Sequence, residues 1–483
     1  MNQGRKIVSA TMLLTFSNLS VRLLSLFTLP ILTRLLPPEA FGSASIAMSM
    51  MALLSVFALA GMDMSYARSH FATQGPSGPA AERFAWRHAI ATSVLMGGLG
   101  GLGWLVASHW LDLSPGLGVL VGIGVVVSVL NIMALVRARL GGHYRRMAAS
   151  IFASGVLTAG ATITMAMFWR QDGSVIMFGI LAGQLLVMIV VGIPAPKMLW
   201  HPSGLAPQER RAVLAIGLAG VITAPLYWVL TSLDRWFLGA IDGAATVGIY
   251  SVAYNVGALG VMVNTAVAAV WLPEAVKLFE ADRQAAPARL GVLAEGLTIG
   301  LAVVWLAVTA AGGDTLRLLT PPEYHAGAIA IPFIAGAVFF NGVLLMVNAG
   351  ALLTHKLYKT AILMLVGGAV CVALNLVLIP VLGLLGAAIA QAASFSMIAV
   401  GVWYNNRRVF PLPNGFGKVG ACGAAMILAA VGMFPAWSAA PLISLLFKAP
   451  VGLAIAATVA YFGAPKIVLP WLRRGRSIFS SRK

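Results

Sequence analysis

Charged residues and cysteines are both scarce in this chain. Of its 483 residues only 10% are charged, whereas 60% are hydrophobic, and the mean hydropathy is +0.92. A soluble protein of this length could not cover its surface with so few charged side chains. The two cysteines, Cys371 and Cys422, both lie in apolar stretches, so neither a disulfide framework nor a metal cluster is indicated. The composition predicts an integral membrane protein.

Nucleotide-binding and nucleic-acid-binding features are also missing. The sequence has no Gly-x-x-x-x-Gly-Lys-Ser/Thr loop and no polar region large enough for a soluble nucleotide-binding domain. Its 32 Lys and Arg outnumber the 14 acids, which gives a formal charge of +18. These cations are scattered between apolar runs and form no basic groove, so no nucleic-acid partner is expected. No cofactor is expected, and coupling to an H+ or Na+ gradient is left open.

Long apolar runs dominate what is present. About fourteen runs are long enough to cross a bilayer, and each needs to be helical because lipid offers the backbone no hydrogen-bond partner. The first continues to Leu36 without a convincing cleavage site, so we expect a spanning helix and not a signal peptide. The runs lie near residues 8–33, 41–62, 88–108, 116–136, 148–168, 174–195, 212–233, 246–271, 291–311, 327–353, 361–381, 384–404, 419–437 and 443–463. The sequence therefore predicts an all-α polytopic membrane protein.

The distribution of positive charge predicts the orientation of these runs. If the N-terminus is cytoplasmic, 26 of the 32 cations fall in cytoplasmic segments. The opposite side receives only five, namely Arg34, Arg170, Arg235, Arg317 and Lys448. Such an excess is typical of cytoplasmic loops. Both termini are therefore expected to face the cytoplasm.

The remaining cation, Arg22, lies inside the first run. At 1.5 Å per helical residue it lies about 24 Å from Lys6 and about 18 Å before Arg34. Polar residues recur on its helix face at steps of three and four, at Thr11, Thr15, Asn18 and Ser25. One interpretation is a face that lines a polar cavity, in which Arg22 binds an anion. The other is contact between helices, with Arg22 bonded to backbone carbonyls of a neighbour.

Other polar residues also lie at helical spacing within the runs. Tyrosines in a cavity could stack on sugars and bond their hydroxyls, although Tyr250 could equally be an anchor at the membrane interface. Amides could line the transport route or bridge helices. The candidates for substrate binding are Tyr227, Tyr250, Tyr254, Asn264, Asn341, Asn375 and Gln391.

The acidic residues nearest to membrane depth are Asp63, Asp234 and Glu295. Together with Arg235 they are candidates for ion coupling or gating. Simple pairing of each acid with a nearby arginine, such as Arg235 beside Asp234, is the alternative. No carboxylate is predicted in the middle of a span.

An internal repeat is indicated by two segment pairs. Residues 41–47 resemble residues 247–253 at an offset of 206, and residues 179–184 resemble residues 386–391 at an offset of 207. Chance likeness between Gly- and Ala-rich helices is the alternative. A repeat of six spans inserts twice in the same orientation. We therefore expect two six-helix lobes around a central cavity, residues 1–205 and 206–408, followed by two extra helices and a basic tail in residues 409–483.

Three sequence motifs lie at or near the ends of the predicted spans. The first is the Thr-Arg-Leu-Leu-Pro-Pro-Glu-Ala-Phe-Gly link at residues 33–42. The second combines residues 233–239 (LDRWFLG), 247–254 (VGIYSVAY) and 271–273 (WLP). The third runs from Asn375 to Ala388. Together the three motifs resemble the polysaccharide and oligosaccharide flippases (Wzx-type) of the multidrug/oligosaccharidyl-lipid/polysaccharide (MOP) transporter superfamily. The resemblance covers most of the chain.

The resemblance implies a transporter that moves an undecaprenyl-diphosphate-linked oligosaccharide from the cytoplasmic to the periplasmic leaflet. It also implies a multi-pass protein of the bacterial inner membrane that works by alternating access in O-antigen, capsule or exopolysaccharide biosynthesis. Membrane lipids, a polysaccharide polymerase and glycosyltransferases are its expected partners. Arg22 is the candidate ligand for the diphosphate, because a guanidinium keeps its charge when desolvated and offers several donors.

Three other functions stay open. A lipid II flippase would share the architecture, and a multidrug antiporter would share it but should need an acidic cavity. A membrane polymerase or ligase would need a catalytic platform outside the membrane, whereas the larger loops here, residues 69–87 and 273–290, are expected in the cytoplasm. The chain is therefore not expected to be an enzyme.

Overall fold

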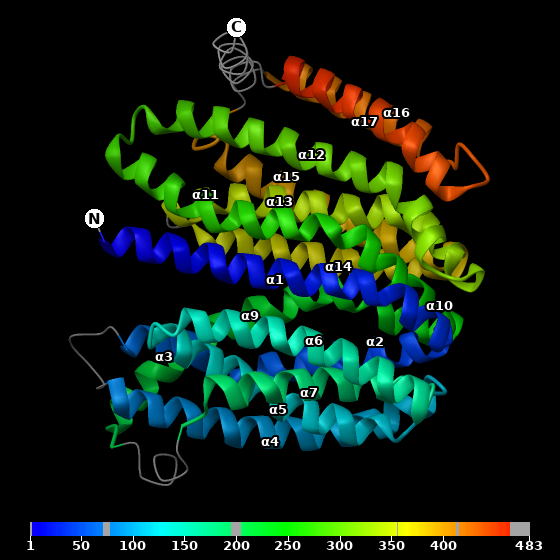
Figure 1. Cartoon of the computed structure of the whole chain (residues 1–483). Helices are drawn as coiled ribbons and strands as arrows, with labels where there is room; N and C mark the ends of the chain where they lie inside the picture. The colour runs from blue at the N-terminus through cyan, green and yellow to red at the C-terminus, as the bar shows by residue number, and fades with distance from the viewer. Residues whose placement is uncertain (1, 71–77, 195–203, 355, 412–414, 464–483) are drawn as a thin grey trace, which may run out of the picture. The chain divides into compact units, whose positions relative to one another are not determined.

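The computed structural model describes residues 2–70, 78–194, 204–354, 356–411 and 415–463, and these are almost entirely helical (Figure 1). The chain divides into two compact units, Met1–Ser251 and Val252–Lys483. This division reflects which helices pack together and does not test the internal repeat. The predicted lobes, residues 1–205 and 206–408, therefore stay a prediction.

The first unit is built around α2 (Pro38–Leu59). This helix packs against α4 (Gly78–Trp110), α5 (Leu117–Leu140), α7 (Ser174–Val191) and α9 (Pro207–Ser232). The short α3 (Met62–His70) contacts α4 and α9, and α1 (Asn2–Leu35) lies along α6 (Tyr144–Phe168), as Figure 1 shows. The buried residues of α2 are mostly small, with Ala40, Ala44, Ala47 and Ala58 each at most 3% exposed. Small residues let membrane helices approach closely, which explains its central position.

Proline and glycine set the ends of α2. Pro38 occupies the first turn, where a missing N–H costs no hydrogen bond. At the other end Ala60 and Gly61 have left-handed backbone angles, with φ of 47° and 67°. The chain then turns into α3.

Two interruptions divide the region after α9. Gly243, with φ of 82° and ψ of 171°, breaks α10 (Asp234–Gly257) into two helical parts. The 3₁₀ turn η1 (Ala258–Gly260) then separates α10 from α11 (Val261–Ala281). The boundary between the units, after Ser251, falls inside the second part of α10.

The second unit has α13 (Ile331–Leu353) at its centre. This helix packs against α11, α12 (Ala286–Leu319), α14 (Leu357–Leu382) and α15 (Leu384–Asn406), and η2 (Pro322–Ala330) precedes it. The last two helices, α16 (Gly415–Met433) and α17 (Pro441–Gly463), form a pair on α12. Most of α13 is buried, in keeping with its central place.

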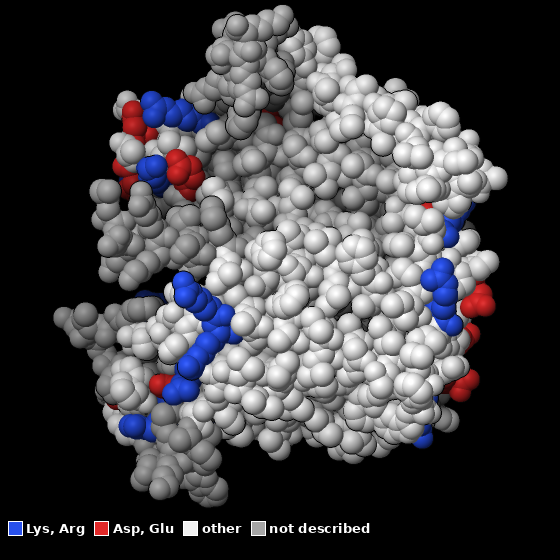
Figure 2. Space-filling model, viewed as in Figure 1, with Lys and Arg blue, Asp and Glu red and all other residues white. Residues whose placement is uncertain are grey.

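Among the described residues, twelve stretches are long and apolar enough to cross a membrane. One of them, Ala224–Ala281, has 58 residues, which at 1.5 Å each would reach about 87 Å, far beyond a bilayer core of about 30 Å. It contains part of one predicted span, 212–233, and the whole of the next, 246–271. Figure 2 shows charged side chains gathered towards helix ends, with uncharged flanks on the face drawn. The predicted all-helical membrane fold is confirmed.

Candidate functional site

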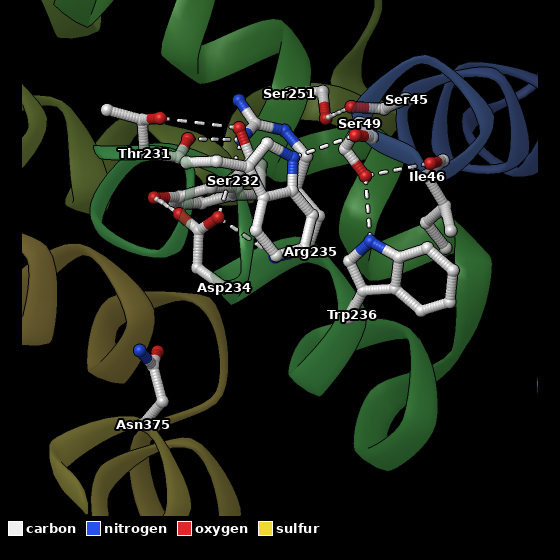
Figure 3. Close-up of polar contacts among 12 residues, drawn as sticks. Ser45, Ile46, Ser49, Thr231, Ser232, Asp234, Arg235, Trp236, Ser251 and Asn375 are labelled. Atoms are coloured by element: carbon white, nitrogen blue, oxygen red, sulfur yellow. Dashed lines mark hydrogen bonds and ion pairs between the residues drawn. The ribbon is translucent and has the colours of Figure 1, made fainter. Parts of the chain in front are cut away.

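A buried carboxylate lies at the corner between α9 and α10. Asp234 begins α10 and is 3% exposed. The Tyr250 hydroxyl donates to its Oδ2 at 2.6 Å, and the backbone N–H of Arg235 donates to Oδ1 at 2.9 Å. Nη1 of Arg235 lies 3.3 Å from Oδ1 and donates to the Thr231 carbonyl at 2.7 Å (Figure 3). The carboxylate is thus compensated by an adjacent guanidinium, which a buried charge requires.

Two tryptophans attach this corner to α2. Nε1 of Trp236 donates to the Ser49 hydroxyl at 2.8 Å, and Nε1 of Trp228 donates to the Ser49 carbonyl at 2.7 Å. Farther along α10, the Ser251 hydroxyl donates to the Ser45 hydroxyl at 2.8 Å. Figure 3 shows Ser45 and Ser49 reaching from α2 towards these partners. This cluster could not be predicted from the sequence, because its bonds join residues up to 206 positions apart.

The predicted polar face of α1 is partly visible. The side chains of Arg22, Asn18 and Ser25 are exposed, and those of Thr11 and Thr15 lie outside the described residues. Asn18 and Ser25 donate to carbonyls of their own helix, Leu14 at 2.8 Å and Arg22 at 2.7 Å. Within the described part of the chain, no hydrogen bond or ion pair of the Arg22 side chain is found. Its binding role stays a prediction.

The other predicted residues are spread over both units. In the first unit Tyr227 is exposed, Asp63 is half-buried, and Tyr250 is fully buried and so is not a surface anchor. In the second unit the amide of Asn264 donates to the Val338 carbonyl on α13, which bridges two helices. The remaining candidates are half-buried, as for Tyr254 and Asn341, or buried, as for Asn375, Gln391 and Glu295.

A buried ion pair joins α12 and α17. Nζ of Lys448 lies 2.6 Å from Oδ2 of Asp314, and both side chains are 2% exposed. Ser444 donates to the same oxygen, and Lys448 also donates to the Ala310 carbonyl. Lys448 was expected at the edge of a span, and no carboxylate was expected in the middle of one. In the structure Lys448 lies seven residues after the first residue of α17, and Asp314 lies five residues before the last residue of α12. The pair thus lies within two helices, near one end of each.

An apolar cavity of about 510 Å³ lies in the second unit. Residues of α12, α13, α15, α16 and α17 line it, and aromatic side chains such as Trp305, Phe339 and Trp403 form much of its wall. Glu295 and Thr298 are among its few polar residues. The cavity therefore suits a hydrocarbon group better than a sugar.

A further charged cluster lies where α3, α4 and α5 meet. Nε of Arg137 lies 2.9 Å from Oε1 of Glu82. Burial and the neighbouring Glu82 carboxylate raise the pKa of Tyr66 on α3, so its hydroxyl stays neutral. Within the described residues no group of His, Cys, Asp and Glu could hold a metal ion.

Comparison with known proteins identifies the family. Residues 7–279 match the model of a family described as polysaccharide biosynthesis protein. No curated protein matches the chain at a significant level.

Solved structures show the fold. The lipid II flippase MurJ, in an inward closed conformation, superposes with a TM-score of 0.74 at 12% identity, over 95% of this chain and all of that one. A multidrug resistance MATE family transporter of the MOP superfamily gives 0.57 at 14% identity, over 81% of this chain and 94% of the other. The chain therefore belongs to the polysaccharide biosynthesis protein family and has the fold of MOP superfamily transporters, as its sequence motifs predicted.

Proposed function

We propose that the chain is a flippase that moves an undecaprenyl-diphosphate-linked oligosaccharide from the cytoplasmic to the periplasmic leaflet. The family match over residues 7–279 carries this proposal, since it covers more than half of the chain. The family and fold are those of transporters, so no catalytic activity is proposed. The proposal includes the bacterial inner membrane, cytoplasmic termini, and a polymerase and glycosyltransferases as partners in the same biosynthesis.

The two chemical parts of the cargo, a charged diphosphate with sugars and an apolar isoprenoid chain, each have a candidate binding site in this protein. A diphosphate and sugars cannot cross hydrocarbon unaided, because each unpaired polar group costs several kcal/mol, on the order of 2–7. An isoprenoid chain has the opposite preference, and the apolar cavity of the second unit would accommodate part of it. For the diphosphate we propose Arg22, which keeps its charge and offers a fork of donors.

If transport is driven by an H+ or Na+ gradient, we propose Glu295 as the residue that binds the coupling ion. Its side chain is 7% exposed and lines the cavity.

Lipid II is the second candidate cargo. The superposition on MurJ extends over nearly the whole chain, and lipid II contains the same kind of lipid diphosphate. Depletion in the native host separates the two: accumulated lipid II would favour this second candidate, and an accumulated oligosaccharide precursor would favour the first.

The first testable prediction concerns Arg22. In a strain without its own flippase, wild type is expected to restore surface polysaccharide. Arg22→Ala is expected to lower export by about 10- to 100-fold, the equivalent of losing one hydrogen bond to a charged group at ~1.5–3 kcal/mol. Arg34→Ala is the matched control, because Arg34 lies on the same helix and its Nη1 donates to the Pro30 carbonyl. Protein levels are compared by immunoblot.

Two results would contradict these proposals separately. If deletion in the native host leaves no lipid-linked oligosaccharide precursor behind, the flippase proposal is wrong. If export by Arg22→Ala equals that of wild type at equal protein level, Arg22 does not bind the diphosphate.

A further inference from the structure

Two glycines lie where α2 crosses α10. A Cβ atom on Gly42 would lie 1.8 Å from the carbonyl oxygen of Ala244, and one on Gly248 would lie 1.8 Å from that of Pro38. These distances are far below van der Waals contact, so a side chain at either position is incompatible with this crossing. The backbones of the two helices therefore meet directly.

The contacts at this crossing involve residues that occupy equivalent positions in the two repeats. Gly42 and Gly248 are 206 residues apart, as are Pro38 and Ala244. Ser45 and Ser251, whose hydroxyls are hydrogen-bonded at 2.8 Å, have the same separation. This is the offset at which residues 41–47 resemble residues 247–253. Gly42 contacts Ala244, and the equivalents of these two residues, Gly248 and Pro38, contact each other in the same way. Such a reciprocal pair of contacts has two-fold symmetry.

A local two-fold axis therefore passes between α2 and α10. Repeats of six spans insert with the same orientation, so an axis that relates them runs along the membrane normal. A route for cargo between two such repeats follows the same axis. A contact between the two repeats on this axis would therefore block the route.

We infer that the crossing of α2 and α10 at Gly42 and Gly248 is a gate that closes the transport route and separates in each cycle. This inference rests on the proposed function and adds the residues at which the route closes. The charge distribution assigns the gate to the periplasmic side, where α1 ends and α2 begins. Its composition suits repeated opening, because glycines meet without interlocking side chains and the hydroxyl pair adds one hydrogen bond.

A reversible cross-link tests the gate directly. In a chain with Cys371 and Cys422 replaced by alanine, Ser45→Cys and Ser251→Cys are expected to form a disulfide, since the hydroxyls they replace lie 2.8 Å apart. Oxidation should abolish polysaccharide export, and reduction should restore it. The two single-cysteine chains are the controls and should export normally under both conditions.

The results test the gate and the proposed function separately. Full export with a complete cross-link would overturn the gate. Failure of wild type to support any export would instead overturn the proposed function.

A second measurement does not depend on the cargo. In the chain carrying Ser45→Cys as its single cysteine, a membrane-impermeant maleimide reports in intact cells how often the gate is open. Gly42→Ala should raise the labelling rate because its Cβ prevents closure, and Gly248→Ala should do the same by symmetry. Gly160→Ala on α6 is the matched control, since a Cβ there meets no atom within 4 Å. Equal labelling of Gly42→Ala and Gly160→Ala, in proteins of equal thermal stability, would contradict the gate.

Discussion

Lys448 and Asp314 show how a charged residue is tolerated within a membrane-spanning helix. Each has its partner on another helix, and Ser444 and the Ala310 carbonyl supply further hydrogen bonds. A buried ion pair of this kind adds little net stability, but removal of one partner leaves an uncompensated charge. The pair therefore fixes which face of α17 packs on α12.

This leads to a prediction at the scale of single residues. Lys448→Met should lower the free energy of unfolding by about 3–5 kcal/mol, and the double variant Lys448→Met/Asp314→Leu should recover most of that loss. Thermal unfolding of the purified protein in detergent measures both. Lys277→Met is the control, because that lysine is exposed and 3.5 Å from Glu274, and its effect should stay within about 1 kcal/mol. A double variant no more stable than the single one would contradict the prediction.

Residues adjacent in sequence could be paired from the sequence, and distant ones could not. Asp234 and Arg235 are neighbours, so their contact was foreseeable. Asp314 and Lys448 are 134 residues apart, and nothing in either apolar segment specifies which helices will meet. The exposed position of Arg22 likewise follows from the packing of α1 on α6 and not from the polar pattern alone.

At the scale of helices, α2 presents one face to α9 and α10. Gly42, Ser45 and Ser49 recur at steps of three and four, and all three contact these helices. The face combines close backbone approach with hydroxyl and indole hydrogen bonds. Such bonds between membrane helices add specificity to packing that the lipid itself does not favour.

The bond between Trp236 and Ser49 gives a prediction at this scale. A double-mutant cycle of Ser49→Ala and Trp236→Phe should yield a coupling energy of about 1 kcal/mol, the usual net value of one hydrogen bond. Ser55→Ala is the control on the same helix, since Ser55 is also buried but bonds the Met51 carbonyl of α2 itself. Its cycle with Trp236→Phe should give no coupling. Equal coupling in both cycles would show that the indole bond has no special role.

Hydropathy predicted the existence of the helices better than their ends. The third and ninth runs were expected over 88–108 and 291–311, whereas α4 and α12 have 33 and 34 residues. Hydropathy marks only the part in hydrocarbon, and polar residues such as Glu82 and Arg83 continue α4 beyond it. The turn η1 and the break at Gly243 left no signal in hydropathy, because their residues are as apolar or small as those around them.

At the scale of the whole molecule, the motifs predicted the family and the apolar runs predicted the fold. The fold is shared with solved structures at sequence identities of only 12–14%. The two compact units could not be predicted, because compactness depends on which helices pack together. The repeat alone does not determine that packing.

Orientation in the membrane can be tested with reporter fusions. A phosphatase that is active only outside the cytoplasm should be active when fused after Asp112, between α4 and α5. It should be inactive when fused after Gly142, between α5 and α6. These expectations follow from the excess of positive charge around Arg137, Arg139, Arg145 and Arg146. The reverse pattern would invert the topology and move the proposed gate to the cytoplasmic side.

The boundary between the two units lies inside α10, so no flexible linker joins them at that point. A loop bends easily because its backbone dihedral angles can change, whereas a continuous helix resists bending. The nearest interruption in the hydrogen-bonding pattern is η1, seven residues after the boundary. Bending of this segment is therefore expected at Ala258–Gly260, where the 3₁₀ turn has poorer hydrogen-bond geometry than the α-helix on either side.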